Sequence, residues 1–489
     1  MTVTAPEVQL RYGDKVLDSG SGGVYPHLNP YTGELQAEIP LAGPAEVDEA
    51  VDLAAGQAES WRRWAPERRR DVLMRFADLL DEHRAEFAAL QALDGGTPTH
   101  FGHRIIDNSV NWTRYYAGWC DKLSGELIST LDTRGYFSYT APEPYGVIGA
   151  IVTWNGPVVS LGMKVIPALA AGNCVVTKPS EFTPFAPDLY GRLLREAGVP
   201  AGVCSILAGG PEAGAALVRN PKVEKISFTG GPAAARQIAH VCAEQLKPAV
   251  LELGGKTGSI VFPDAGDLRE VAERAVRDSI GVLAGQGCVV PTRLIVHADI
   301  YDEMVKLVTA AAASYKVGDP FDPEVKVGPL INAAAVERVC GMLDRARRDN
   351  AGRIVLGGGR AGGDLAGKNY VEPTVIVDAD PHHEISQAEI FGPVLLVFRF
   401  ATEDEAVELA NSTPYGLGAN IQSTNLTRVH RLAERLKAGG VYVNGARQNL
   451  PHTPFGGLGI SGYGKEGGRA GIDEFLRYKT VSIIEPQGS

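Results

Sequence analysis

The amino-acid sequence predicts an α/β fold with two parallel-sheet domains and a separate β segment. Apolar β runs alternate with helical stretches over residues 145–252, and a second alternation follows residue 288. Alternation at this spacing implies right-handed crossovers and a parallel sheet with helices on both faces. Two β-like regions without helices, at 125–143 and 475–485, lie outside both alternations. Ligands of such sheets bind beyond the carboxyl ends of the strands.

The first half of the chain begins with extended segments and turns over residues 1–43. Apolar residues at helical spacing then predict two amphipathic helices, at about 44–61 and 67–92. The arginines at 68–70 are interpreted as a solvated helix face. The predicted strands of the first sheet are 146–152, 173–177, 203–207, 224–228 and 248–252, and the helices between them are about 158–171, 187–198, 212–219 and 233–245.

The second half repeats the alternation. Its predicted strands are near 292–297, 371–377, 393–400, 418–422 and 440–444, with helices near 300–313, 333–348, 403–411 and 426–437. The isolated strands at 125–143 and 475–485 need a partner to cover their edges, and a neighbouring subunit is one candidate. The glycine-rich stretch 357–363 is interpreted as a loop.

Composition excludes several classes of function. The chain has 489 residues, is 44% hydrophobic and carries a net charge of -11, which disfavours a nucleic-acid or anionic-membrane surface. No apolar run approaches the roughly 20 residues of a membrane helix. The first residues lack the basic and apolar regions of a signal peptide, so we expect a cytoplasmic protein. Six scattered cysteines without a CxxC pair suit a reduced compartment, and we predict no metal.

Cys288 stands in the stretch Gly285-Gln286-Gly287-Cys288. The two glycines leave the backbone beside Cys288 free of side chains, so that a substrate carbon can approach the sulfur closely. A nucleophile is one interpretation of this cysteine. The other interpretation is a buried free cysteine that only packs in the core, because free cysteines are commonly buried.

Two polar residues follow predicted strands and have alternative interpretations. Glu252 ends the strand 248–252; burial would raise its pKa toward that of a useful general base, whereas an exposed strand-end glutamate would be unremarkable. Asn155 follows the strand 146–152 and could donate to a developing oxyanion. It could equally be an ordinary helix N-cap.

Three further motifs suit a dinucleotide. Lysine and glutamate at a strand end could hold the two hydroxyls of a ribose and repel a 2′-phosphate, which favours NAD over NADP. Small residues where a strand turns into a helix suit a pyrophosphate. An acid with an aromatic before a strand could bind a ribose and back a flat ring. These motifs are Lys178-Pro179-Ser180-Glu181, Phe228-Thr229-Gly230-Gly231-Pro232 and Glu389-Ile390-Phe391-Gly392-Pro393.

Each of these motifs also has a plain structural interpretation: a surface turn, an ordinary strand-to-helix turn and an apolar strand start. The pattern GxGxxG occurs at residues 457–462, but no clear strand–turn–helix surrounds it. We therefore reject it as a dinucleotide fingerprint.

Taken together, in their order and spacing, the motifs resemble the NAD(P)-dependent aldehyde dehydrogenase superfamily along nearly the whole chain. The matching stretches are Thr153-Trp154-Asn155, Lys178-Pro179-Ser180-Glu181, Phe228-Thr229-Gly230, Glu252-Leu253-Gly254-Gly255-Lys256, Gly285-Gln286-Gly287-Cys288, Glu389-Ile390-Phe391-Gly392-Pro393, Asn411 with Tyr415-Gly416-Leu417, and Pro454-Phe455-Gly456-Gly457 through Ser461-Gly462. The departures from the family pattern are Thr153, Gly231, Ala235 and Gly459, and none removes a catalytic group.

The resemblance implies an aldehyde-dehydrogenase-like fold with a Rossmann-type NAD domain (1–124 and 144–251), an α/β catalytic domain (252–469) and a β oligomerisation arm (125–143 and 470–489). It also implies a homodimer or homotetramer. Cys288 would attack a small-molecule aldehyde, Asn155 would hold the oxyanion, and Glu252 would activate water against the thioester. Lys164 and Glu466 match a proposed proton-relay pair, although both could equally form a structural ion pair.

The resemblance also assigns cofactor and substrate positions. NAD, with NADP as the alternative, would lie against Ile151, Thr153, Trp154, Lys178, Ser180, Glu181, Thr229, Gly230, Gly231, Leu253, Glu389 and Phe391. The substrate would meet Gly156, Gly287, Val289, Leu450 and Phe455. Gly156 stands where many relatives carry an aromatic residue, so we expect a medium or large apolar or aromatic aldehyde.

Two rival functions stay open at this point. A CoA-acylating semialdehyde dehydrogenase would resolve the thioester with CoA, but that branch typically lacks the glutamate found here as Glu252. A non-catalytic structural or binding protein could use the same fold, because fold does not fix function.

Overall fold

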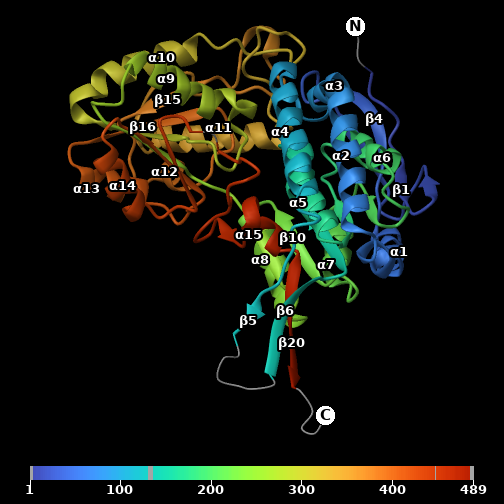
Figure 1. Ribbon diagram of the computed structural model, residues 1–489. Helices are drawn as coiled ribbons and strands as arrows, with labels where there is room; N and C mark the ends of the chain where they lie inside the picture. The colour runs from blue at the N-terminus through green and yellow to red at the C-terminus, as the bar shows by residue number, and fades with distance from the viewer. Residues whose placement is uncertain (1–3, 130–135, 447, 485–489) are drawn as a thin grey trace.

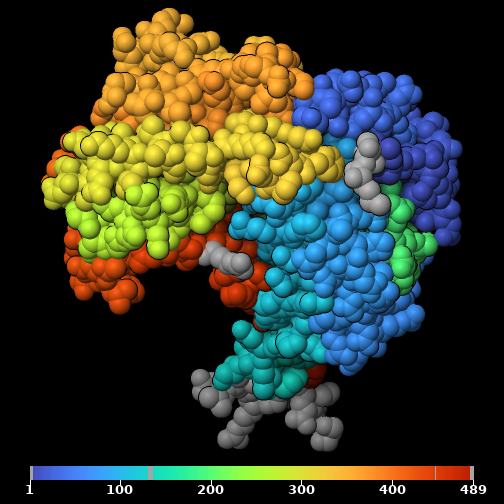
Figure 2. Space-filling model, turned by 90° about the horizontal axis from the view of Figure 1, so that it is seen from above, coloured from blue at the N-terminus to red at the C-terminus, as the bar shows by residue number. Residues whose placement is uncertain are grey.

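The computed structural model describes residues 4–129, 136–446 and 448–484. Figure 1 shows two α/β bodies beside each other and a β ribbon that projects away from them. Figure 2 shows the blue N-terminal segments in contact with the yellow and orange segments of the second body. Backbone and side-chain hydrogen bonds cross this contact: Asn369 Nδ2 donates to Pro30 O at 3.0 Å, and Thr99 N donates to Pro320 O at 3.0 Å. The α/β architecture is the one that the sequence predicts.

The first body contains an eight-stranded sheet in the order β19-β11-β10-β7-β8-β9-β1-β2. The strands from β11 to β9 run parallel, whereas β1, β2 and β19 are antiparallel additions at the two edges. The strands are β1 (Leu10–Tyr12), β2 (Lys15–Leu17), β7 (Val147–Ile151), β8 (Cys174–Lys178), β9 (Cys204–Ile206), β10 (Lys225–Thr229), β11 (Ala249–Glu252) and β19 (Gly462–Tyr463).

Helices cover both faces of this sheet. The strand β7 is apolar and fully buried, and α5 is buried along almost its whole length because it lies between β7, β8 and α4. The helices of this body are α1 (Pro44–Arg62), α2 (Pro66–Glu82), α3 (Arg84–Gly95), α4 (Thr99–Ala117), α5 (Pro157–Ala170), α6 (Phe185–Glu196), α7 (Pro211–Arg219), α8 (Pro232–Glu244) and the late α15 (Gly468–Asp473).

The second body contains a seven-stranded sheet in the order β14-β15-β16-β13-β12-β17-β18, parallel except at the β14 edge. Its strands are β12 (Gly258–Val261), β13 (Arg293–His297), β14 (Arg353–Leu356), β15 (Thr374–Val377), β16 (Val394–Phe400), β17 (Gly418–Gln422) and β18 (Gly440–Val443). Its helices are α9 (Leu268–Val276), α10 (Tyr301–Ala313), α11 (Ala333–Arg348), α12 (Glu384–Gln387), α13 (Glu403–Ala410) and α14 (Leu426–Arg435).

The two isolated β regions pair with each other. β20 (Leu476–Ile484) runs antiparallel to β6 (Tyr136–Pro144), and β5 (Leu127–Ile128) adds a third strand. Their side chains include exposed apolar residues, among them Leu127, Phe137, Ile483 and Ile484. A separate two-stranded ribbon, β3 (Val24–Leu28) with β4 (Leu35–Pro40), lies in the N-terminal body.

The prediction of one helix over 67–92 was wrong. His83 leaves helical geometry (φ -94°, ψ 16°) and separates α2 from α3. The apolar spacing continues through this break because both helices pack on α4 and α6.

Helix α4 was not predicted from the sequence. Its buried face includes Ser109, Trp112 and Thr113, so the aliphatic periodicity is weak there.

The expectation that the arginines at 68–70 form a solvated face was wrong for Arg69. This side chain is 6% exposed, and its Nη1 donates to Trp64 O at 2.7 Å and to Arg62 O at 3.2 Å. It therefore satisfies carbonyl groups at the end of α1, where a helix leaves its last acceptors without partners.

None of the helices in the described part of the chain combines the length and the apolar character that a bilayer crossing requires. The GxGxxG pattern at 457–462 ends in β19, which pairs antiparallel with β11. No helix opens at the motif, so its rejection as a dinucleotide fingerprint is confirmed.

Candidate active site

Cys288 follows a tightly wound turn between the two bodies. Leu283, Ala284 and Gly285 all have positive φ (49°, 53° and 74°) after a short π-helical segment at Arg277–Gly281. Left-handed non-glycine residues are strained, and such strain collects at functional sites. A Cβ on Gly285 would lie 2.0 Å from Gly392 O, so this glycine makes room for backbone. The expectation that Gly285 provides substrate access was therefore wrong.

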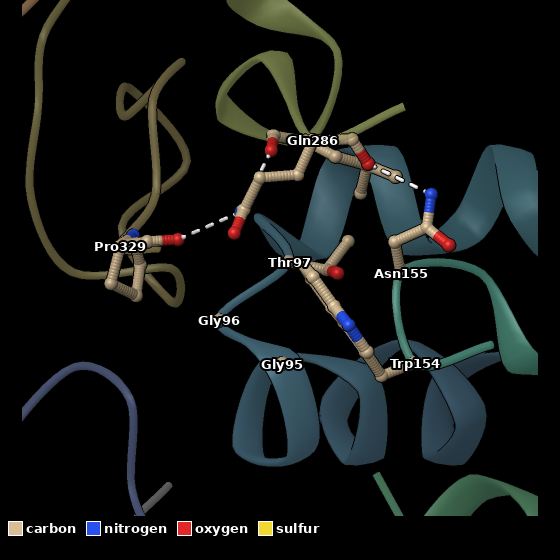
Figure 3. A pocket seen from close by; sticks show the side chains of 8 residues that line it. Gly95, Gly96, Thr97, Trp154, Asn155, Gln286 and Pro329 are labelled. Atoms are coloured by element: carbon tan, nitrogen blue, oxygen red, sulfur yellow. Dashed lines mark hydrogen bonds between the residues drawn. The ribbon is translucent and has the colours of Figure 1, made fainter. Parts of the chain in front are cut away.

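Gln286 holds this turn in place. Its Nε2 donates to Leu283 O at 2.9 Å and to Pro329 O at 3.3 Å, and its Oε1 accepts from Ile331 N at 3.0 Å. Figure 3 shows the side chain reaching toward Pro329 while the backbone carbonyl faces Asn155. A role for Gln286 could not be predicted from the sequence, because two of its partners, Pro329 and Ile331, are distant in the chain.

Asn155 lies between β7 and α5 and points at the cysteine turn (Figure 3). Its Nδ2 donates to Gln286 O at 2.8 Å, and its Oδ1 accepts from Thr153 Oγ1 at 2.9 Å. The N-cap of α5 is Gly156, so the helix-cap alternative for Asn155 is excluded. The amide has two hydrogens, and this bond to Gln286 uses one of them.

Glu252 ends β11 in the interior. It is 3% exposed, and within the described residues neither carboxylate oxygen has a hydrogen-bond partner. Burial raises the pKa of Glu252 well above its usual value; the charge of Glu466 adds to this, while Lys164 and Lys465 oppose it. The alternative of an exposed strand-end glutamate is excluded. A Cβ on Gly456 would lie 2.6 Å from Glu252 Oε1, so the Phe-Gly-Gly stretch gives the carboxylate its space.

Lys164 and Glu466 form an ion pair beside Glu252. Lys164 is fully buried and Glu466 is 4% exposed, and Lys164 Nζ also donates to Ser227 Oγ at 3.1 Å. The two charges come from α5 and from the segment between β19 and α15. The pair and Glu252 therefore form one buried cluster at the carboxyl end of the first sheet.

The thiol of Cys288 is half-buried and is protonated at rest. Burial raises its pKa to about 12, and the negative charges of Glu389 and Glu252 raise it further in the same direction. Because the thiolate is the nucleophilic form, attack by this sulfur requires a base to take the proton.

Lys178, the last residue of β8, faces Glu181 in the turn that follows. Lys178 Nζ and Glu181 Oε2 are 3.6 Å apart, and both side chains are largely buried. Ser180 Oγ accepts from Phe182 N at 3.3 Å and so shapes the turn. Burial lowers the pKa of Lys178, and the charge of Glu181 opposes that effect. The pair is thus a preformed polar site, and an exposed surface turn is excluded.

Thr229, Gly230 and Gly231 connect β10 to α8. Gly231 is the N-cap of α8, and no side chain caps this helix. A Cβ on Gly231 would meet no atom within 4 Å, so open space lies before the helix start. A helix N-terminus of this kind can take a phosphate group through its free N–H groups and its dipole.

Glu389 and Phe391 precede β16. Glu389 Oε1 accepts from Gly255 N at 2.9 Å. Burial raises the pKa of Glu389 to about 7, although the Gly255 N–H, Lys256 and Arg338 oppose the shift. Phe391 has a φ of 53°, and its ring meets Trp154 edge to face with centroids 5.4 Å apart.

The remaining predicted positions lie around these groups. Ile151 is the last residue of β7, and Leu253 N donates to Ser461 O at 3.0 Å. Gly156 has open space, since a Cβ there would meet nothing within 4 Å, whereas a Cβ on Gly287 would lie 2.6 Å from Val290 Cγ2. Val289 and Leu450 are half-buried, and Phe455 is 6% exposed.

A small pocket lies between Trp154, Asn155 and Pro329 (Figure 3). Its lining residues that sequence reasoning did not single out are Gly95, Gly96, Thr97, Leu283 and Pro329. In the described part of the chain, no three His, Cys, Asp or Glu side chains gather as a metal ion would require.

Comparison with known proteins gives a consistent result. The family model described as "Aldehyde dehydrogenase family" matches residues 17–481. An aldehyde dehydrogenase of Enchytraeus buchholzi is 38% identical, covering 97% of this chain and 95% of that protein. Human retinal dehydrogenase 2 is 36% identical, covering 99% and 94%. The NAD+ complex of a Bacillus cereus aldehyde dehydrogenase is 34% identical with a TM-score of 0.94, covering 98% and 97%.

The motif order, the fold and these comparisons agree over nearly the whole chain. The protein therefore belongs to the aldehyde dehydrogenase family, the NAD(P)-dependent oxidoreductases that oxidise aldehydes.

Proposed function

We propose that the protein converts a medium or large apolar or aromatic aldehyde into its carboxylic acid with NAD, through a thiohemiacetal and a thioester on Cys288. Glu252 carries this proposal: it is 3% exposed, and within the described residues its oxygens have no hydrogen-bond partner. A buried acceptor without a partner is costly to keep. Burial raises the pKa of Glu252, and a raised pKa makes the carboxylate a stronger base.

The polar groups beyond the first sheet fit a dinucleotide. Lys178 and Glu181 would take the hydroxyls of the adenosine ribose, and the open helix start at Gly231 would take the pyrophosphate. Glu389 would accept from the second ribose, with Phe391 and Trp154 beside the ring. When bound, NAD supplies an acceptor for the hydride of the substrate. A carboxylate at Glu181 repels a 2′-phosphate, which favours NAD over NADP.

The first covalent step uses Cys288. Its sulfur bonds to the aldehyde carbon while Glu252 takes the thiol proton. A base is needed because the thiol, with its raised pKa, otherwise stays protonated. The carbonyl oxygen becomes an oxyanion. The second amide hydrogen of Asn155 and the backbone N–H of Cys288 donate to it. Hydride departure then leaves a thioester on Cys288.

The second covalent step uses Glu252 again. Its carboxylate takes a proton from water as the water oxygen bonds to the thioester carbon, and the carbon–sulfur bond breaks. Glu252 then gives this proton to the departing sulfur, so the products are the carboxylic acid and the free thiol of Cys288. The thiol proton that Glu252 took in the first step has to leave before the second step begins. Lys164 and Glu466 would pass it toward solvent, since the three groups form one buried cluster.

Formation of NADH with a panel of aldehydes, without added CoA, tests the mechanism. We expect turnover by the wild type and its loss in Cys288→Ala, while Cys340→Ala, a half-buried cysteine on α11, retains activity. A wild type that is silent until CoA is added would instead support a CoA-acylating enzyme. Silence of both proteins with NAD, NADP and CoA would support a non-catalytic protein.

The open space at Gly156 supports a large substrate. The name of the retinal dehydrogenase relative is consistent with that size class. We expect a higher kcat/KM for hexanal and benzaldehyde than for acetaldehyde. Gly156→Phe should lower that preference about 10- to 100-fold, which is the usual range for a filled apolar pocket. Gly359→Phe, which also faces open space, is the control; an acetaldehyde preference in the wild type contradicts the proposal.

The β arm supports self-association. Exposed apolar side chains on β5, β6 and β20 would be covered in a homodimer or homotetramer of this chain. Light scattering on the wild type and on Ile483→Lys would distinguish an assembly through this arm from a monomer.

The domain division we propose has three parts. They are the NAD-binding domain (1–124 and 144–251), the catalytic domain (252–469) and the arm (125–143 and 470–489).

A further inference from the structure

Two buried titratable residues lie outside the catalytic groups and close to the loop that follows β8. His27, on β3, and Asp94, near the end of α3, are each 1% exposed. Neither has a role in the mechanism above. Buried polar side chains are normally hydrogen-bonded. The partners of His27 and Asp94 therefore show which backbone groups these two residues hold in place.

The ring of His27 is fixed by neutral partners on both nitrogens. Its Nε2 lies 2.9 Å from Phe182 O and donates to it, because a carbonyl can only accept. Its Nδ1 accepts from Gln36 Nε2 at 3.0 Å, and the same amide donates to Leu93 O at 2.8 Å. Burial lowers the pKa of His27, in agreement with a neutral ring in this tautomer.

Asp94 caps a helix from outside that helix. Its two carboxylate oxygens accept from Phe185 N and Ala186 N, both at 2.9 Å, at the start of α6. The N-cap residue of α6 is Pro184, whose side chain cannot accept a hydrogen bond. The carboxylate therefore provides the cap that the helix's own sequence does not supply.

The two residues act on opposite ends of the same short segment. His27 holds the carbonyl of Phe182, and Asp94 holds the amides of Phe185 and Ala186. His27 Nε2 and Asp94 Oδ1 are 3.9 Å apart, which is too long for a hydrogen bond, so each binds the backbone independently. Tyr25 of the same ribbon packs on Phe182, with ring centroids 5.8 Å apart.

This segment begins at the residue after Glu181. The turn from Lys178 to Glu181 is fixed at its start by β8 and at its end by the contacts of Phe182. Asp94 is also followed directly by Gly95, Gly96 and Thr97, which line the pocket behind Trp154 and Asn155 (Figure 3). The N-terminal ribbon is thereby connected to the proposed adenosine-ribose site.

We propose that His27 and Asp94 are positioning residues for the cofactor: they hold the 178–186 segment in the conformation in which Lys178 and Glu181 meet the adenosine ribose. This inference rests on the proposed role of Lys178 and Glu181. Without the donor of His27, only a fraction of the molecules hold the segment in the conformation that binds NAD. The apparent dissociation constant for NAD then equals the intrinsic constant divided by that fraction.

The test compares His27→Phe, which keeps a ring and loses both hydrogen bonds, with His27→Gln, which keeps a donor for Phe182 O. We expect His27→Phe to raise the calorimetric Kd and the KM for NAD about tenfold, with kcat at saturating NAD nearly unchanged. His27→Gln should restore most of the affinity. His430→Phe, at an exposed position of α14, is the control and should match the wild type. An unchanged Kd in His27→Phe overturns the inference.

If His27→Phe does not fold, Asp94→Asn takes its place, because it keeps the shape and loses one of two acceptors. It should raise the Kd for NAD about threefold, again without a fall in kcat; an unchanged Kd overturns the inference. Glu181→Gln, measured in parallel, separates the two proposals. If Glu181→Gln weakens NAD binding and the His27 and Asp94 variants do not, only the positioning role fails. If Glu181→Gln leaves NAD binding and the preference over NADP unchanged, the ribose assignment fails, and the positioning role that rests on it fails with it.

Discussion

Two glutamates at the centre of the protein have opposite surroundings. Glu252 has no hydrogen-bond partner within the described residues, and the charge of Glu466 opposes its ionisation. Glu389 accepts a hydrogen bond from Gly255 N, and the positive charges of Lys256 and Arg338 favour its ionised form. Burial raises the pKa of both carboxyls. A carboxylate fixed by donors suits the binding of a ligand hydroxyl, whereas one without partners is free to take a proton and give it up. The hydrogen-bond partners, and not the residue type, separate the two proposed roles.

The largest expected effect is on Glu252. Glu252→Gln should lower steady-state acid formation about 10²- to 10⁴-fold, because the amide cannot accept the proton of water. Thermal stability should not fall, since an unpartnered buried carboxylate is removed. Glu408→Gln, at an exposed position of α13, is the control. Turnover at the wild-type rate would mean that the two glutamates do not differ in the way described.

The next effect is on the ion pair that accompanies Glu252. Lys164→Met keeps the length of the side chain but leaves Glu466 buried without its partner, at a cost of about 3–5 kcal/mol in the free energy of unfolding. The double variant Lys164→Met/Glu466→Gln should recover part of that loss. Urea unfolding measures both, with the exposed Lys306→Met on α10 as the control. Equal stability of Lys164→Met and the control would contradict the buried-cluster interpretation.

A smaller effect concerns Glu389 and pH. Burial raises its pKa from the usual 4.5 to about 7, so the carboxyl is protonated below pH 7 and becomes a good acceptor only as the pH rises through that value. The KM for NAD should therefore fall as the pH rises through about 7. Glu389→Gln should remove this dependence and raise the KM at pH 8 about tenfold. A pH profile of the variant that parallels the wild type would assign the titration to another group.

Much of the fold could be predicted from the sequence. The strands β7–β11, β13 and β15–β18 are short apolar runs bounded by turns, and most helices between them show apolar spacing. The strands β12 and β14 and the short helix α12 were not predicted. Helix α4 could not be found in this way, since polar and aromatic side chains form part of its buried face. Arg69 was misinterpreted because its acceptors are carbonyls at the end of the preceding helix, and residue type does not reveal a partner of that kind.

The candidate site was predictable to a different extent. Cys288, Glu252 and Asn155 could be singled out because they follow strand ends or stand among glycines, and their roles came from the resemblance to the family. The contacts of Gln286 with Pro329 and Ile331 could not be predicted, because they join segments that only the folded chain brings together. The same holds for His27 and Phe182, which are 155 residues apart.

The pair of Lys164 and Glu466 joins residues that are 302 positions apart in the chain. Protein synthesis proceeds from the N-terminus and domains tend to fold in that order, so Lys164 is made long before its counter-charge. Any chain that ends before Glu466 has to bury an uncompensated ammonium group or leave α5 unpacked. An incomplete translation product would therefore be poorly folded and open to proteolysis, and only a finished polypeptide would acquire a stable catalytic centre.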